Sequence, residues 1–196
     1  MTFRRLGIAG YMGAGKSVAA RLLAAQADAV IIDADHEAKS LMAADQGVRR
    51  KLVLAFGDSI IGKDGLSFAT LGRLVFGSME KLLQLNTIVH PPLVRRLRPL
   101  LLQPRANRNS VLDAALLPLW NIESWFDTCL WIHAPFEKRL ERLKRMRSDL
   151  DEHSLRDRMR LQEESLPAPD RPPWRQIQND GSIEHLAETL AQEPLA

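Results

Sequence analysis

Cysteine is nearly absent from this sequence of 196 residues. Cys129 is the only one, so no intramolecular disulfide can form. The residue lies in an apolar run, where a lone cysteine is most simply a buried small side chain. A chain that does not rely on disulfides suits a reducing compartment, and we expect it to be cytoplasmic.

Long apolar runs are missing as well. No stretch reaches the length needed to cross a bilayer, so we expect no membrane partner. Arg4 and Arg5 precede a short apolar segment that faintly resembles a signal peptide, but its glycines favour a first strand instead. The sequence has no internal repeat and no low-complexity segment. Its length suits one compact domain with inserted helices.

The chain also lacks a strong excess of either charge. Its formal net charge is only +3, which suits anionic ligands such as nucleotides but is too weak to indicate nucleic acid. The basic residues concentrate in one segment, and no aromatic side chains interleave with them for base stacking. A nucleic-acid-binding module is therefore the weakest hypothesis, and we expect no nucleic-acid partner.

What the sequence does contain is a phosphate-binding motif. Residues 10–17 read GYMGAGKS and fit the pattern G-x-x-x-x-G-K-[ST]. Its glycines allow positive φ, so that successive backbone N–H groups can surround a phosphate. The lysine supplies charge to the β- and γ-phosphates, and the Ser17 hydroxyl is placed to bind Mg²⁺. We therefore predict ATP and Mg²⁺ as cofactors, bound by Met12, Gly13, Ala14, Gly15, Lys16 and Ser17.

The segments on either side support this motif. Residues 6–9 are apolar and predict a buried strand, while Val18 and Leu22 stand one helical turn apart. Strand, glycine loop and helix thus follow in the order that the motif requires. The plain alternative is a chance glycine-rich turn, which this order disfavours. A dinucleotide-binding loop is excluded, because its G-x-G-x-x-G spacing fails at Val18.

Four more apolar runs predict strands, at residues 29–32, 110–112 and 129–132 and around Ile177. Because helices alternate with them, we predict an α/β fold with a parallel five-stranded sheet and a ligand site at its C-terminal edge. Residues 47–101 have helical spacing and no convincing strand, which predicts an inserted helical substrate subdomain. The charged helical stretches over residues 136–165 predict a lid.

Two carboxylates end predicted strands and should face the same crevice as the glycine loop. Asp33 is a candidate general base for an attacking hydroxyl; the alternative is that it caps the next helix, the more economical role for Asp35. Asp113 is a candidate for binding Mg²⁺ or a substrate group, or else a turn residue. His90 precedes two prolines, where we expect a helix to break, and is either structural or a substrate ligand.

A dense basic cluster lies in the predicted lid. One hypothesis is a solvated helix face, balanced by neighbouring glutamates. The other is that arginines close over the triphosphate and stabilise the transition state, and Arg142 and Arg147 are the catalytic candidates. The cluster consists of Arg139, Arg142, Lys144, Arg145 and Arg147.

Together these motifs resemble the dephospho-coenzyme A kinase family over nearly the whole chain. The resemblance rests on the loop, VIIDAD at residues 30–35, LNTIVHP at 85–91, VLD at 111–113 and IQNDGS at 177–182. It implies the three-layer α/β/α fold of P-loop nucleoside kinases, with a helical coenzyme A subdomain and a lid. It also implies transfer of the ATP γ-phosphate to the ribose 3′-hydroxyl of dephospho-coenzyme A, the last step of coenzyme A synthesis. Asp33 matches the family's base, and Asn179 lies where the family contacts adenine.

The chain departs from the family pattern at several positions. Tyr11 and Ala14 replace the usual Gly and Ser of the loop, and the lid has one extra residue between Arg142 and Arg147. The stretch after Asp113 also differs at Ala115, Pro118 and Leu119, where Leu119 replaces an acidic residue of the family, and this leaves the acceptor selectivity open.

Two alternatives to the leading hypothesis follow. One is a related kinase for another nucleoside or nucleotide, and the other is a nucleotide-binding regulator without turnover. Asp33 distinguishes a kinase from a regulator, because a protein that only binds nucleotide needs Lys16 and Ser17 but no base. We expect His90, Asp113 and Asp33 on the acceptor side, and a monomer or weak oligomer.

Overall fold

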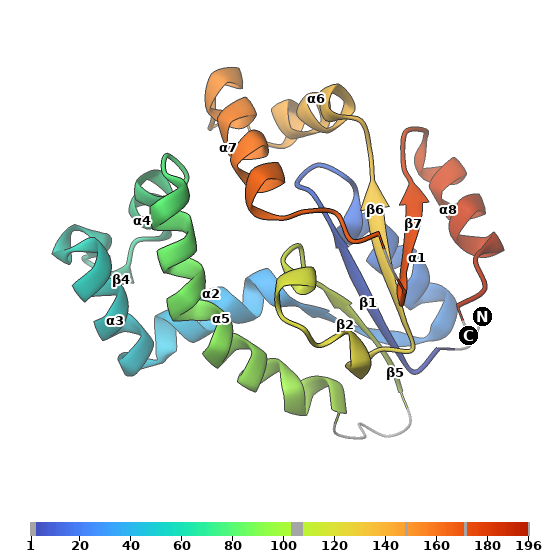
Figure 1. Cartoon of the computed structure of the whole chain (residues 1–196), viewed down its shortest axis with the longest axis horizontal. Helices are drawn as coiled ribbons and strands as arrows, with labels where there is room; N and C mark the ends of the chain where they lie inside the picture. The colour runs from blue at the N-terminus through green and yellow to red at the C-terminus, as the bar shows by residue number, and fades with distance from the viewer. Residues whose placement is uncertain (1–2, 103–107, 148, 171, 196) are drawn as a thin grey trace. The chain divides into compact units, whose positions relative to one another are not determined.

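A computed structural model describes residues 3–102, 108–147, 149–170 and 172–195. The chain forms two compact units (Figure 1). The first, the sheet unit, consists of Met1–Asp33 and Leu100–Ala196, and the second, the helical unit, is Ala34–Pro99.

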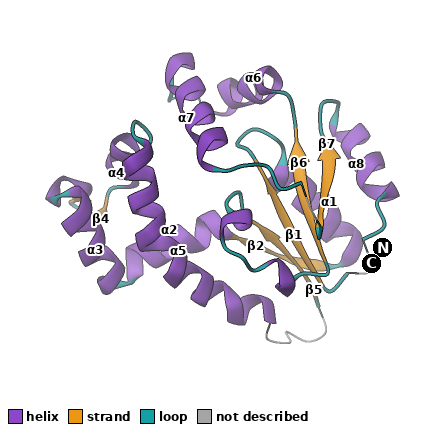
Figure 2. Cartoon of the chain, in the orientation of Figure 1, coloured by secondary structure: helices purple, strands orange, loops and turns teal. Residues whose placement is uncertain are grey.

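The sheet unit is built on five parallel strands in the order β2-β5-β1-β6-β7 (Figure 2). This confirms the predicted parallel five-stranded sheet. Strands covered on both faces read as continuous apolar runs rather than as alternating ones, which is why these segments were recognisable. The strands are β1 (Arg5–Gly10), β2 (Ala29–Asp33), β5 (Asn109–Asp113), β6 (Thr128–His133) and β7 (Trp174–Gln178).

One face of the sheet carries the main core. Helices α1 (Lys16–Ala27) and α8 (Ile183–Gln192) pack together here, and Leu23 and Leu190 are fully buried against Ile8 and Ile132 of the strands. On the other face, Gly7 of β1 approaches the turn η2 (Leu117–Leu119) so closely that a Cβ would lie 2.7 Å from the Leu117 side chain. A short turn, η3 (Glu123–Trp125), follows.

Two charged helices connect β6 to β7. They are α6 (Phe136–Met146) and α7 (Glu152–Ser165), and the Asp151 side chain caps the second by accepting a bond from the Ser154 backbone N–H. Between them lies a small apolar cluster of their own, made by Leu140, Leu143, Leu155 and Met159. We call this pair the α6–α7 hairpin.

The helical unit begins at Ala34, so the compact unit starts earlier than the predicted insertion of residues 47–101. The turn η1 (Asp58–Ile60) is followed by a short β-hairpin, which the sequence did not indicate. Its strands, of two residues each, are β3 (Ile61–Gly62) and β4 (Gly65–Leu66). The helices of this unit are α2 (Ala34–Ala44), α3 (Gln46–Phe56), α4 (Phe68–Val75) and α5 (Met79–Leu102), the last of which ends in the sheet unit.

Helix α5 corrects the expectation of a break after His90. It runs for 24 residues through Pro91, Pro92 and Pro99. Prolines remove backbone donors and disfavour the helix locally, but the spacing of apolar residues overrides this. Val89, Leu93 and Leu97 stand four residues apart on one stripe and are at most 5% exposed. Despite the length of α5, no helix within the described residues is long and apolar enough to cross a membrane.

Candidate active site

The loop between β1 and α1 has the backbone that phosphate binding requires. Gly13 and Gly15 have φ of +75° and +96°, and α1 begins at Lys16 directly after them. Glycine is needed at position 13 for a second reason, since a Cβ there would lie 2.7 Å from the backbone oxygen of Arg139. Positive φ and close packing thus act together, and the N-terminus of α1 points its N–H groups into the loop.

The two polar residues that open α1 make contacts consistent with their predicted roles. The Lys16 ammonium donates to the Tyr11 carbonyl at 3.3 Å. The Ser17 hydroxyl donates to a carboxylate oxygen of Asp113 at 2.5 Å, and Asp113 is only 9% exposed. A hydroxyl beside a buried carboxylate is a hard oxygen pair of the kind that Mg²⁺ prefers. Within the described residues no group of three or more His, Cys, Asp or Glu is placed to hold a metal ion.

Asp33 and Asp113 end neighbouring strands at the same level. The two residues are paired in register across β2 and β5, and adjacent strands lie about 4.8 Å apart. Asp33 is exposed, whereas Asp113 is buried against Ser17. The structure therefore brings Ser17, Asp33 and Asp113 to one edge of the sheet, as the strand-end argument predicts, and gives the two carboxylates different surroundings.

The loop after β7 contacts the phosphate loop directly. Asn179 is 5% exposed, and its side-chain amide donates to the Ala14 carbonyl at 2.7 Å. Arg142 joins the two loops, since its guanidinium donates to Asn179 O at 3.1 Å and to Gly13 O at 3.4 Å. The Asn179 side chain, which was expected to contact adenine, thus bonds to the phosphate loop instead. A contact between Asn179 and adenine stays a prediction.

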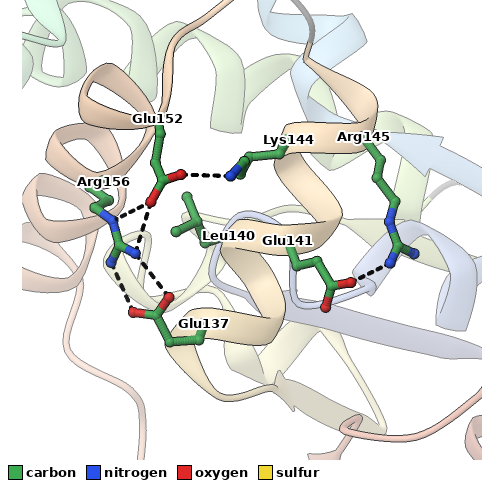
Figure 3. Close-up of a pocket in the computed structure, with 7 residues that line it drawn as sticks. All are labelled: Glu137, Leu140, Glu141, Lys144, Arg145, Glu152 and Arg156. Atoms are coloured by element: carbon green, nitrogen blue, oxygen red, sulfur yellow. Dashed lines mark hydrogen bonds and ion pairs between the residues drawn. The ribbon is translucent and has the colours of Figure 1, made fainter.

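The basic cluster of the α6–α7 hairpin divides into separate groups. Both helices line a cavity of about 400 Å³. Lys144 pairs there with Glu152, at 2.6 Å, and Arg145 pairs with Glu141 (Figure 3). Both cations are exposed, and the bonds from Lys144 and Arg156 hold the pKa of Glu152 below its usual value. Lys144 and Arg145 therefore fit the hypothesis of a solvated, charge-balanced helix face.

The remaining arginines have other surroundings. Arg139 is 2% exposed and pairs with Glu163, so it is an internal residue of the hairpin rather than a cation that faces solvent. Arg147 forms a bidentate pair with Asp149 at 2.9 and 3.0 Å, which raises the pKa of the guanidinium. Burial and the nearby charge of Arg147 lower the pKa of Arg158. Two cations thus lie close together at this end of the hairpin.

His90 lies on α5 of the helical unit. Burial lowers the pKa of its imidazole to about 4, so the ring is neutral at pH 7. A neutral imidazole can donate one hydrogen bond and accept another.

Sequence reasoning missed how firmly α7 holds the phosphate loop. The Tyr11 hydroxyl donates to Leu166 O at 2.9 Å, and the Met12 backbone N–H donates to Gln162 Oε1 at 2.7 Å. The unusual tyrosine within a glycine loop was the available signal, but its partner lies 155 residues away.

A family model described as dephospho-CoA kinase matches residues 4–184 of the chain. This chain belongs to the dephospho-CoA kinase family. Membership confirms the expected family and makes the protein a kinase, and the P-loop geometry above fits that enzyme class.

Curated relatives from this family cover most of the chain. The dephospho-CoA kinase of Thermobifida fusca is 33% identical over 81% of this chain and 78% of its own length. That of Carboxydothermus hydrogenoformans is 33% identical over 94% of this chain and 90% of its own. For both relatives the similarity covers more than two thirds of each chain, so it extends well beyond the phosphate loop.

Solved structures agree with the dephospho-CoA kinase fold. A Thermus thermophilus protein is 29% identical, with a TM-score of 0.68 over 95% of this chain and 94% of its own. The dephospho-CoA kinase of Campylobacter jejuni is 18% identical, with a TM-score of 0.54 over 96% and 94% of the two chains. The predicted P-loop kinase fold is thus confirmed.

Proposed function

We propose that this kinase transfers the γ-phosphoryl group of ATP to the ribose 3′-hydroxyl of dephospho-CoA, giving CoA and ADP. The observation that carries the proposal is the convergence of Ser17, Asp113 and Asp33 at the end of the phosphate loop. It combines an oxygen pair for a nucleotide-bound cation, the Ser17 hydroxyl and the buried Asp113 carboxylate, with an exposed carboxylate for the acceptor.

The phosphate side is assigned to the loop and the start of α1. Backbone N–H groups of residues 13–17 would hold the phosphates, and Lys16 would exchange its bond to Tyr11 O for the γ-phosphate. Mg²⁺, when bound, would supply positive charge that neutralises the phosphates. Ser17 and Asp113 are the residues that would hold it.

Asp33 is assigned to the acceptor side. It is exposed at the sheet edge, beside the strand that carries Asp113, and would accept the proton of the attacking hydroxyl. Phosphoryl transfer depends mainly on positioning and charge, so the base need not be strongly activated. Arg142, which joins the phosphate loop to the loop after β7, and Arg147 are assigned to stabilising charge on the phosphates.

The helical unit is assigned to binding the rest of the acceptor, and residues 136–165 to the lid. His90 would contact a polar group of the acceptor through a neutral ring, which can donate one hydrogen bond and accept another. Asp113 would hold the cation and would also lie on the acceptor side, because it is paired in register with Asp33.

A competition assay tests the proposed reaction. Dephospho-CoA, adenosine, AMP and simple nucleosides are offered with Mg-ATP under matched conditions, and ADP release is measured. We expect dephospho-CoA to have the highest kcat/KM, with Lys16→Ala as the inactive control because the γ-phosphate loses its cation. A higher kcat/KM for another acceptor would assign the chain to a different substrate, and ATP binding without any acceptor turnover would indicate a regulator.

A further inference from the structure

The outer half of the phosphate loop, Tyr11 and Met12, is fastened to the α6–α7 hairpin on several sides. The Tyr11 hydroxyl bonds to Leu166 O and the Met12 N–H to Gln162, at 2.9 and 2.7 Å. The Met12 side chain packs against the apolar cluster between α6 and α7. Backbone and side chains of the loop are therefore both held by the hairpin.

A buried cation completes this attachment. Arg139 donates from Nε to Ala134 O at 3.0 Å and from Nη1 to Met12 O at 3.5 Å, and it pairs with Glu163 through Nη2. Its guanidinium carbon lies 5.0 Å from the centroid of the Tyr11 ring. A buried charge needs such partners on every side, so the tyrosine ring covers part of a cation that would otherwise meet solvent or apolar atoms.

Tyr11 cannot move easily away from this position. Its ring meets the Trp131 ring edge-on, with centroids 4.9 Å apart and planes at 87°. Trp131 is fully buried on β6 and in turn meets Trp174 of β7 edge-on, at 6.5 Å. The tyrosine thus has one side against the sheet and another against the cation, while its hydroxyl reaches the end of α7.

We propose that Tyr11 is a positioning residue, which holds the phosphate loop in its nucleotide-binding shape before ATP arrives. The proposal rests on the function proposed above and adds a residue that does not itself touch the reacting atoms. A loop that is already ordered loses less conformational freedom on binding, and affinity rises accordingly. The carbonyl of Tyr11 also receives the Lys16 ammonium at 3.3 Å, so the same residue places the lysine beside the site.

The predicted effect falls on ATP binding rather than on the chemical step. The loop N–H groups hold the phosphates both in the ground state and in the transition state, so loosening the loop weakens both equally. Such a change raises KM with little effect on kcat. A side chain that only stabilised the fold would change the melting temperature and leave KM for ATP unaltered at temperatures well below melting.

Two variants test the proposal in the full chain. Tyr11→Phe keeps the ring and removes the bond to Leu166 O, and Tyr11→Leu removes the ring as well. Calorimetry measures the Kd of a non-hydrolysable ATP analogue with Mg²⁺, and kinetics give kcat and both KM values. Tyr11→Phe should raise the Kd and the KM for ATP by about three- to tenfold, the weight of one hydrogen bond. Tyr11→Leu should raise them further, while kcat and the KM for the acceptor stay within about twofold.

A control separates positioning from stability. Leu190→Val on α8 disturbs the core without removing any of the Tyr11 contacts described above, so it should lower the melting temperature without changing the Kd of the analogue. Lowered melting temperatures with an unchanged Kd in both Tyr11 variants would reduce Tyr11 to a packing residue. If Tyr11→Leu does not fold, Tyr11→Phe decides alone. Calorimetry needs no acceptor, so a wrong acceptor leaves this test intact, whereas no analogue binding by the unaltered chain overturns both proposals.

Discussion

At the scale of single residues, the surroundings divide chemically similar groups into different roles. Asp113 is buried against the Ser17 hydroxyl, whereas its neighbour Asp33 is exposed at the same sheet edge. The same sequence signal, a carboxylate after a strand, therefore yields one residue suited to a cation and another suited to a substrate proton.

The first prediction concerns Asp33. Asp33→Asn removes the proton acceptor but keeps the size of the side chain, so kcat should fall about 10²–10⁴-fold, the usual weight of general acid–base catalysis. The Kd of Mg-ATP should change little, since the carboxylate is assigned to the acceptor. Steady-state kinetics and calorimetry on one preparation measure both. Lost ATP binding with a normal residual rate would make Asp33 a nucleotide or metal ligand instead.

The second prediction concerns Cys129. Burial, with a contribution from the Glu123 charge, raises the pKa of its thiol to about 12. At pH 8 only about one part in ten thousand would be thiolate, so a disulfide reagent should not label the folded chain. The absorbance change with such a reagent checks this, and the same chain in denaturant is the control. Rapid labelling of the native protein would show that the β6 core opens readily.

At the scale of elements, the basic side chains of the α6–α7 hairpin have different surroundings. Lys144 and Arg145 lie on the exposed side, paired with glutamates, while Arg142 reaches the two loops of the nucleotide site. Exposed ion pairs contribute only about 0–1 kcal/mol, so these pairs are a poor guide to function.

The third prediction follows from this division. Lys144→Ala and Arg145→Ala should leave kcat/KM for ATP within about twofold, since these side chains are assigned no role in the site. Arg142→Ala should lower it by about tenfold or more, because bonds from a charged group to both loops are lost. Kinetics on the three variants provide the comparison, and Lys144→Ala is the matched control. Equal losses in all three would indicate that the whole helix acts on the triphosphate.

At the scale of the whole molecule, stability should depend on pH through His90. Burial lowers the pKa of this imidazole from 6.5 to about 4, so between these values the unfolded chain binds a proton that the folded chain does not. Stability then rises with pH over this range. The contribution is fully present above pH 6.5 and is lost as the pH falls towards 4.

The fourth prediction puts a magnitude on this effect. Lowering the pH from 7.5 to 4 should remove about 3 kcal/mol of unfolding free energy through His90. His90→Gln should flatten this part of the pH profile, whereas His153→Gln, on the exposed face of α7, should leave it unchanged. Denaturant titrations at several pH values measure the profile. An unchanged slope in His90→Gln would show that the ring protonates freely in the folded state.

The phosphate loop, the five parallel strands and the two strand-end carboxylates could all be predicted from the sequence alone. These features depend on local rules. Glycines permit positive φ, apolar runs become strands, and parallel strands bring their carboxyl ends to one edge. Residues 10–17 and the positions of Asp33 and Asp113 could therefore be located without coordinates.

Roles that depend on partners far along the chain became clear only from the folded structure. Arg139 and Arg145 have the same side chain and lie on one helix, yet one is buried against Tyr11 and the other is exposed. The Asn179 amide is taken by Ala14 O, and α5 continues through three prolines because a buried stripe holds it. In each case packing between distant segments outweighs local preference, and a linear sequence does not reveal which segments meet.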